Sequence, residues 1–361
     1  MNRFLFVSLH SENNKIVSKM KTNREYINAT IEELQNNPEW ESIYDRYANE
    51  LTINSKRYSE KAKLFQVNRP IVVYSSLGNV KTNSKTATFD LRFAGQSIGR
   101  IEVDKDNEVK LFVSESQAEY AKENFEFTDS QTLKGVLWKE SKEAKRFRQF
   151  YYNLESTSSV KIKSKEHRIE SMLLKEFSKT SRKEKLLCNI QPIRLGGKFF
   201  QLKTPLKAST HNPNISLTKN KNGATGGGVD ILARVKHSHV DYRIAIIELK
   251  DENKEAESQE AAMFQAMTYA TFIAKLLRSK SGVKWYNIFR PSKKDKPLKD
   301  NIDIDVVTLM PMDGKSHEGE LDTIHIASLD VTLHPYTLYY RSDKDGNPSS
   351  FEGTLTDALL K

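Results

Sequence analysis

The chain of 361 residues is poor in cysteine and has no apolar stretch long enough to cross a membrane. Its single cysteine, Cys188 in LLCNI, excludes an intrachain disulfide framework and a cysteine-rich zinc site. We expect Cys188 to be a buried apolar residue of a strand. A membrane span needs about 18 apolar residues, and the short N-terminal stretch FLFVSL is too brief for a secretory signal, so it is expected to form a strand. We therefore expect no membrane contact and a cytoplasmic, reducing location.

Two phosphate-binding motifs are also missing. The sequence contains neither GxxxxGK[ST] nor GxGxxG, so ATP and dinucleotide binding lack support. The segment GATGGG at 223–228 is rich in glycine but lacks the Lys-Ser/Thr pair of a phosphate loop. His237 and His239 could share a face as metal ligands. Because no third nitrogen or sulfur ligand stands near them in the sequence, we expect them in a solvated hairpin turn.

Positive charge is what the chain has in excess. It carries 57 basic and 47 acidic residues, a formal net charge of +10, and residues 156–361 account for +8 of it. A basic protein is attracted to polyanions, of which nucleic acid is the usual one. Residues 161–185 alone hold nine Lys or Arg against four Glu, which suits either a phosphate-contact surface or a solvated helix face.

The first part of the chain predicts an α+β domain over residues 1–155. Apolar residues recur at helical spacing over 22–65, with a break at Asn37-Pro38, and strand-like runs separated by turns over 70–114 predict a β-meander. Helices are expected near 115–124 and 138–154. Nothing in this half indicates a reaction, so we regard it as an accessory domain of unknown role. It could bind a second copy of the chain or another protein partner.

The second part, residues 160–361, predicts an α/β domain after a linker at 156–159. A basic helix is expected over 164–180 and an alanine-rich helix over 255–279. Between and after these helices, apolar or alternating runs predict strands at 186–193, 198–204, 228–235, 242–250 and 301–310, with a β-rich tail over 323–340. Four of these runs stand between the two helices, and with three of them in the core its expected order is helix, three strands, helix, strand.

Three ionisable residues stand at the ends of two consecutive strands in this domain. Asp230 follows the glycines 226–228, whereas Glu248 and Lys250 end the apolar run Ile244–Ile247. Residues i and i+2 of a strand share a face, so Glu248 and Lys250 point together, and a hairpin would bring Asp230 beside Glu248. Two carboxylates can hold Mg²⁺, and a neighbouring lysine can orient an attacking water or stabilise developing negative charge. The glycines would let the backbone approach a phosphate.

This arrangement resembles the PD-(D/E)XK nuclease superfamily over residues 164–311. Asp230 and Glu248-Leu249-Lys250 match its motif, although Val229 replaces the proline of the family's name. The resemblance implies a restriction-endonuclease-like αβββαβ core with a mixed sheet flanked by helices, and Mg²⁺-dependent hydrolysis of DNA phosphodiesters, with Mn²⁺ as a substitute. It also implies that the carbonyl of Leu249 joins the metal ligands. Restriction, phage defence and DNA repair are the settings it suggests.

Two helices add to the resemblance. Gln265 and Tyr269, one helical turn apart, are similar to the Gln-x-x-x-Tyr element of the exonuclease-like branch, which flanks the active site. Glu170 resembles the additional acidic metal ligand of the first core helix, with Glu166 and Glu176 as competitors.

Two other interpretations stay open. The chain could keep the nuclease fold but only bind nucleic acid, without catalysis. It could also be a protein-interaction module in which the acids and lysine form a structural salt-bridge cluster across two strands.

Overall fold

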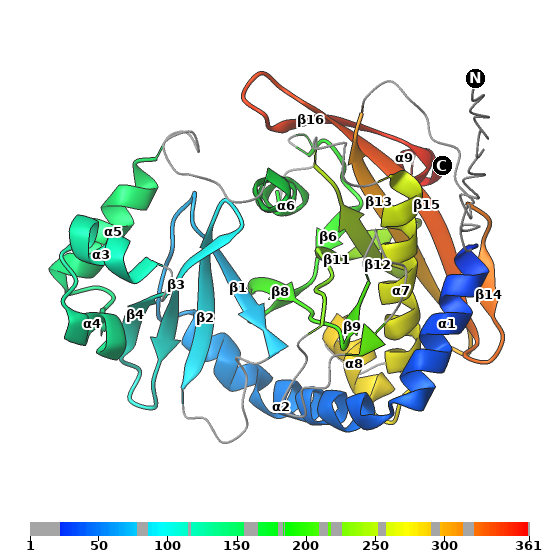
Figure 1. Cartoon of the computed structure of the whole chain (residues 1–361), viewed down its shortest axis with the longest axis horizontal. Helices are drawn as coiled ribbons and strands as arrows, with labels where there is room; N and C mark the ends of the chain where they lie inside the picture. Colours follow the sequence, from blue (N-terminus) through cyan, green and yellow to red (C-terminus); the bar gives the residue numbers. More distant parts are fainter. Residues whose placement is uncertain are drawn as a thin grey trace, which may run out of the picture.

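The protein is a mixed α/β structure with two mixed β-sheets, seen side by side in a computed structural model (Figure 1). The structure describes residues 22–77, 86–114, 117–154, 165–179, 183, 185–208, 216–217, 226–251, 258–289, 297–312 and 321–359. The strand expected at the N-terminus lies outside these residues. Within the described ranges, no helix is long and apolar enough to cross a membrane.

Two helices open the described chain, α1 (Asn23–Asn36) and α2 (Glu39–Ala62). Thr22 caps α1 by accepting a hydrogen bond from the backbone N–H of Glu25, whose carboxylate bonds back in turn. The break at Asn37-Pro38 confirms the expected interruption, since proline lacks the N–H that a continuing helix needs. α1 packs on α7 (Gln259–Leu277), where the Tyr26 ring stacks on Phe264 with ring centroids 4.2 Å apart. Trp40 and Tyr44 of α2 contact Phe272 of the same helix.

The first sheet has the order β5-β4-β3-β2-β1-β8-β7. The strands β1 to β4 form the expected antiparallel meander, and Phe89 and Leu91 lie on the buried face of β2. β8 joins β1 in parallel, so a strand from the second half of the chain extends this sheet. The strands are β1 (Val72–Ser76), β2 (Ala87–Phe93), β3 (Gln96–Val103), β4 (Val109–Val113), β5 (Val136–Leu137), β7 (Arg194–Leu195) and β8 (Lys198–Gln201).

Three helices accompany this sheet: α3 (Ala118–Phe125), α4 (Asp129–Lys134) and α5 (Lys142–Tyr152). α3 and α5 confirm the helices expected near 115–124 and 138–154, whereas α4 and β5 were not anticipated. Phe125, Phe147 and Tyr151 form an aromatic cluster where α3 meets α5.

The second sheet has the order β14-β15-β13-β12-β11-β6, with β16 paired to β15. β12, β13 and β15 are parallel, and β11 is antiparallel to both β12 and β6. The strands are β6 (Ile190–Pro192), β11 (Ile231–Lys236), β12 (Tyr242–Leu249), β13 (Ile302–Pro311), β14 (Ile324–Ile326), β15 (Val331–Ser342) and β16 (Pro348–Glu352). A separate two-strand ladder joins β9 (Leu206–Lys207) to β10 (Ser216–Leu217).

Helices lie on both faces of this second sheet. α7 packs on β12 and β13, with Ile246 and Val306 in the core beneath it. On the other face, Ile247 and Val307 join the core formed by α6 (Lys165–Phe177) and α9 (Thr354–Leu359). β12 is therefore buried on both sides, and a polar side chain at its end must find its partners inside the protein.

The structure corrects two sequence expectations. The strand expected over 186–193 is reduced to β6, and Cys188 lies half-buried in a turn rather than buried in a strand. The strand expected over 198–204 pairs with the first sheet, which leaves the chain order α6, β6, β11, β12, α7, β13 around the second sheet. The helix α8 (Gly282–Phe289), β16 and α9 were not anticipated. The division of the chain at residue 155 stays a prediction.

Candidate functional site

The structure brings Asp230 and Glu248 together at one end of β12. Ile231 pairs with Ile247 across β11 and β12, so the next pair in that register is Asp230 and Glu248. Asp230 is held there because its Oδ2 accepts a hydrogen bond of 2.9 Å from the backbone N–H of Leu249. The expected hairpin is thus present, and it places the two carboxylates as neighbours.

Glu248 is buried, with 1% of its surface exposed. Its Oε1 accepts a hydrogen bond of 2.9 Å from Nζ of Lys250, while its buried Oε2 has no hydrogen-bond partner among the described residues. Burial and the charge of Asp230 raise the pKa of Glu248 well above its ordinary value, and Lys250 opposes the shift. An unpartnered buried carboxylate oxygen beside a second acid is a costly arrangement that a cation would relieve.

Lys250 and the helix α7 close the other side of the site. Nζ of Lys250, 7% exposed, donates a second hydrogen bond of 3.3 Å to Oε1 of Gln265. Gln265 is in turn hydrogen-bonded to Tyr269, whose pKa is raised by burial and by the charge of Glu248. The two α7 residues singled out in the sequence therefore lie beside the strand motif and form one chain of contacts with it.

The glycines before Asp230 have a packing role that the sequence did not indicate. A Cβ added to Gly227 would collide with the Tyr269 hydroxyl, and one added to Gly226 would collide with the backbone at Thr204 and Leu206. Gly227 thus makes room for the Tyr269 side chain at the site. The expectation that these glycines admit a phosphate stays a prediction.

Glu170 approaches the site from α6. It is 4% exposed, and burial followed by the charge of Asp230 raises its pKa to about 8. Its competitor Glu176 is engaged elsewhere, with the backbone N–H of Leu186 and with Lys179. Glu166, one helical turn from Glu170, contributes a further negative charge that raises the pKa of both Glu170 and Glu248.

The first sheet supplies neighbours of Glu170 that sequence reasoning missed. The Tyr74 hydroxyl on β1 donates a hydrogen bond of 3.1 Å to Oε1 of Glu170. The Arg92 guanidinium lies over the Tyr74 ring, 4.2 Å from its centroid, and donates a 2.6 Å hydrogen bond to Oε1 of Gln201 on β8. No local motif marks these residues, because they lie on strands of the first sheet that are far from Glu170 in the sequence.

The chemistry of the site suits a hard divalent cation. Asp230, Glu170 and Glu248 offer oxygen donors, the type that Mg²⁺ prefers, and Asp230 raises the pKa of both other acids. Among the described residues, no three His, Cys, Asp or Glu side chains are already gathered closely enough to hold a metal. The pair Asp230 and Glu248, with the unpartnered Oε2, is the part that could hold a cation.

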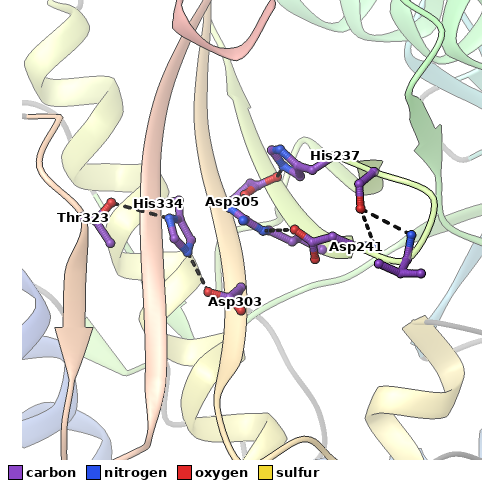
Figure 2. A network of polar contacts seen from close by, with 9 residues as sticks. His237, Asp241, Asp303, Asp305, Thr323 and His334 are labelled. Carbon is purple, nitrogen blue, oxygen red and sulfur yellow. Dashed lines mark hydrogen bonds and ion pairs between the residues drawn. The ribbon is translucent and has the colours of Figure 1, made fainter. Parts of the chain in front are cut away.

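A second polar network lies at the opposite ends of β12 and β13 (Figure 2). His237 is not solvated as expected: its Nε2 lies 2.6 Å from Oδ2 of the fully buried Asp305, and 10% of its side chain is exposed. Arg243 lies near the second oxygen of Asp305, and His334 bonds Asp303 on the neighbouring strand. His239 is exposed in the turn, so the two histidines do not act as a pair.

The acidic site therefore combines Asp230 just before β11, the end of β12 with Lys250 after it, and residues of α6 and α7, with neighbours from the first sheet. The structure brings Asp230, Glu248, Lys250 and Gln265 into one set of contacts, and Leu249 contributes its backbone N–H to Asp230. The roles expected of these residues, of Tyr269 and of Glu170 stay predictions. The Leu249 carbonyl as a metal ligand also stays a prediction. Comparison with known proteins adds no assignment, since no family model, no curated protein and no solved structure matches the chain.

Proposed function

We propose that the protein is a Mg²⁺-dependent nuclease of the PD-(D/E)XK type that hydrolyses DNA phosphodiester bonds. The observation that carries the proposal is the meeting of Asp230, Glu248 and Lys250 at the end of a buried strand pair. Burying two acids with one amine is expensive, and the ion pair between Lys250 and Glu248 leaves the second oxygen of Glu248 without a partner in the described part of the chain, one that a charged ligand could supply. A phosphodiester with a divalent cation is a ligand of that kind.

Each residue has a role in this proposal. Asp230 and Glu248 would hold the cation, with Glu170 and the Leu249 carbonyl as further oxygen donors. A bound Mg²⁺, or Mn²⁺ in its place, supplies charge neutralisation at the phosphate and a more acidic water. Lys250 orients the attacking water or stabilises the negative charge that develops on the phosphate.

Gln265 and Tyr269 are positioning residues. Gln265 accepts a hydrogen bond from Lys250 and bonds Tyr269, so the two side chains limit where the ammonium group can point. Substituting either would lower activity by loosening Lys250 rather than by removing a reacting group.

The arrangement of elements supports the same family. With β7 to β10 and α8 set aside, the elements around the second sheet follow one another as α6, β6, β11, β12, α7 and β13, which is compatible with the αβββαβ order that the resemblance implies. The net charge of +8 on residues 156–361 favours a polyanionic substrate. A setting in restriction, phage defence or DNA repair follows from the family rather than from any contact in the chain.

The test is cleavage of supercoiled plasmid, linear duplex and single strands with and without Mg²⁺. We expect activity that requires the metal and falls by about a hundredfold or more in Lys250→Ala and Glu248→Gln. Glu260→Gln changes an exposed acid of α7 and serves as the matched control. Cleavage that persists unchanged in Lys250→Ala would show that it comes from another site or a contaminant.

The inactive alternative, a nucleic-acid-binding or protein-interaction module, makes the opposite prediction for the metal. The Lys250 to Glu248 contact then serves only as a structural ion pair. Titration calorimetry with Mg²⁺ and Mn²⁺ separates the two proposals. A nuclease binds the metal through Asp230 and loses it in Asp230→Asn, whereas a protein with a purely structural ion pair shows no metal affinity that depends on Asp230.

A further inference from the structure

A pocket of about 510 Å³ opens in the N-terminal half of the protein. It is bordered by the residues that follow α2, by those that follow β5, and by α5, and its lining includes no residue of the acidic site. Three lining residues are basic, Lys63, Lys139 and Arg148, and none is acidic. Its volume lies in the range of small-molecule sites, about 300–1,000 Å³.

Arg148 is held in a fixed orientation at this pocket. Its guanidinium lies over the Trp138 ring, 4.6 Å from the centroid, and donates a hydrogen bond to the Trp138 carbonyl oxygen. Trp138 is itself buried. Burial lowers the pKa of Arg148, which means that the cation has lost part of its hydration. An anion that reached this guanidinium would restore the lost interaction through a charge-assisted hydrogen bond.

More positive charge gathers next to the segment 63–69 that borders the pocket. Lys198 lies over the Phe65 ring, 4.6 Å from its centroid, and Arg194 lies over Phe199 at the same distance. The pKa of Arg194 is lowered by burial and by the charge of Arg69, and that of Lys198 by burial and by Arg194. Cations that repel one another form a field that attracts an anion to this side of the protein.

The other lining residues suit a base rather than a bare anion. Gln66 and Asn68 bring side-chain amides, which can donate and accept along the edge of a nucleobase. The Asn68 backbone N–H donates a 2.9 Å hydrogen bond to the Tyr152 hydroxyl, which fixes this wall of the pocket. Leu64 and the Tyr152 ring add apolar surface. A ligand that combines a phosphate with a flat, polar-edged base matches the basic residues, the side-chain amides and the apolar surface of this pocket.

We propose that this pocket binds a nucleoside phosphate, with Lys63, Lys139 and Arg148 on the phosphate and Gln66 and Asn68 on the base. The same chemistry has two sources, a free mononucleotide and the phosphorylated end of a nucleic-acid strand. The inference does not depend on the proposed nuclease activity, because the pocket shares no residue with the acidic site.

Titration calorimetry on the full chain in EDTA tests the proposal without hydrolysis. The probes are adenosine and cytidine 5′-monophosphate, inorganic phosphate, and a single-stranded hexamer with and without a 5′-phosphate. We expect at least one nucleoside phosphate to bind more tightly than inorganic phosphate, and Lys63→Ala with Lys139→Ala to weaken it by about tenfold or more. The exposed pair Lys134→Ala with Lys145→Ala removes the same charge outside the pocket lining and is expected to change affinity less than about twofold.

The probes separate the two sources. Tight mononucleotide binding identifies a free nucleotide, and binding confined to the 5′-phosphorylated hexamer identifies a strand end. The proposal is overturned if neither a mononucleotide nor the 5′-phosphorylated hexamer binds, or if the only binding is to hexamers regardless of the 5′-phosphate. It is also overturned if inorganic phosphate binds as tightly, or if the control pair weakens binding equally. Arg148→Gln is a further test, with its melting curve checked because Arg148 also bonds Trp138.

Discussion

The raised pKa of Glu170 makes the stability of the protein depend on pH in a definite direction. This carboxyl titrates near pH 8 in the folded chain and near its ordinary value of 4.5 when unfolded. Between those values the folded state holds the proton and the unfolded state does not, so the stabilisation is complete below about pH 4.5 and is lost as pH rises through 8. The difference between the folded and unfolded pKa of Glu170 corresponds to about 5 kcal/mol of unfolding free energy. About 3 kcal/mol of this stabilisation is lost between pH 6 and pH 9.

Urea unfolding of the wild type and of Glu170→Gln, followed by circular dichroism at pH 6 and pH 9 in EDTA, measures this loss. Glutamine keeps the shape of the side chain and cannot ionise, so the fall in unfolding free energy should shrink by about 3 kcal/mol in the variant. Part of the fall remains, because Glu248 is shifted in the same direction. An equal pH dependence in both proteins would refute the raised pKa of Glu170, which rests first on its burial and then on the charge of Asp230.

Magnesium extends the same experiment. A cation must displace the proton from Glu170 in order to use that carboxylate, so its affinity should rise as pH increases through 8. We therefore expect Mg²⁺ to restore more stability at pH 9 than at pH 6 in the wild type. Stabilisation by Mg²⁺ that is the same at both pH values, or that survives in Asp230→Asn, would argue against a cation at this site.

Three further predictions follow from single contacts. Asp230→Asn can still accept the hydrogen bond from the Leu249 N–H but removes a negative charge, so its unfolding free energy without metal should equal or exceed that of the wild type, while cleavage is lost. Clear destabilisation of this variant would favour a structural ion-pair network. Gly227→Ala should lower both the melting temperature and the cleavage rate, because the added methyl group displaces the Tyr269 hydroxyl. Adding Tyr269→Phe should recover part of the lost stability, and strictly additive effects of the two substitutions would contradict this contact. Tyr26→Ala should cost about 3–5 kcal/mol in urea unfolding by removing a buried ring stacked against α7, and Tyr26→Phe should cost far less; equal costs would contradict the stacking.

The strand pair and its acids were predictable from the sequence because their signals are local. The run Ile244–Ile247 marks a buried strand, and the positions of Glu248 and Lys250 follow from the two-residue period of that strand. The hairpin to Asp230 requires only a short turn between neighbouring strands. Likewise, Gln265 and Tyr269 share a face of α7 because they are one turn apart.

The contribution of the first sheet could not be predicted, because it depends on pairing between distant parts of the chain. KFFQLKT has the pattern of a strand, but nothing in that pattern says that β8 pairs with β1 rather than with β11. The prediction of a solvated His237 was wrong for a similar reason. Asp305 alternates with apolar residues on β13, and only the register of neighbouring strands brings it to His237.

The pairing of β8 with β1 has a consequence for how the site is assembled. Tyr74 reaches Glu170 from β1, and Arg92 both covers Tyr74 and bonds Gln201 on β8. The Tyr74 hydroxyl donates to Glu170, an interaction that favours the ionised carboxylate, whereas burial and Asp230 favour the protonated one. Tyr74 and Arg92 of the first sheet thus oppose the rise in the pKa of Glu170 on α6 without reversing it. A part of the chain that holds no candidate catalytic residue therefore influences the pH at which Glu170 ionises.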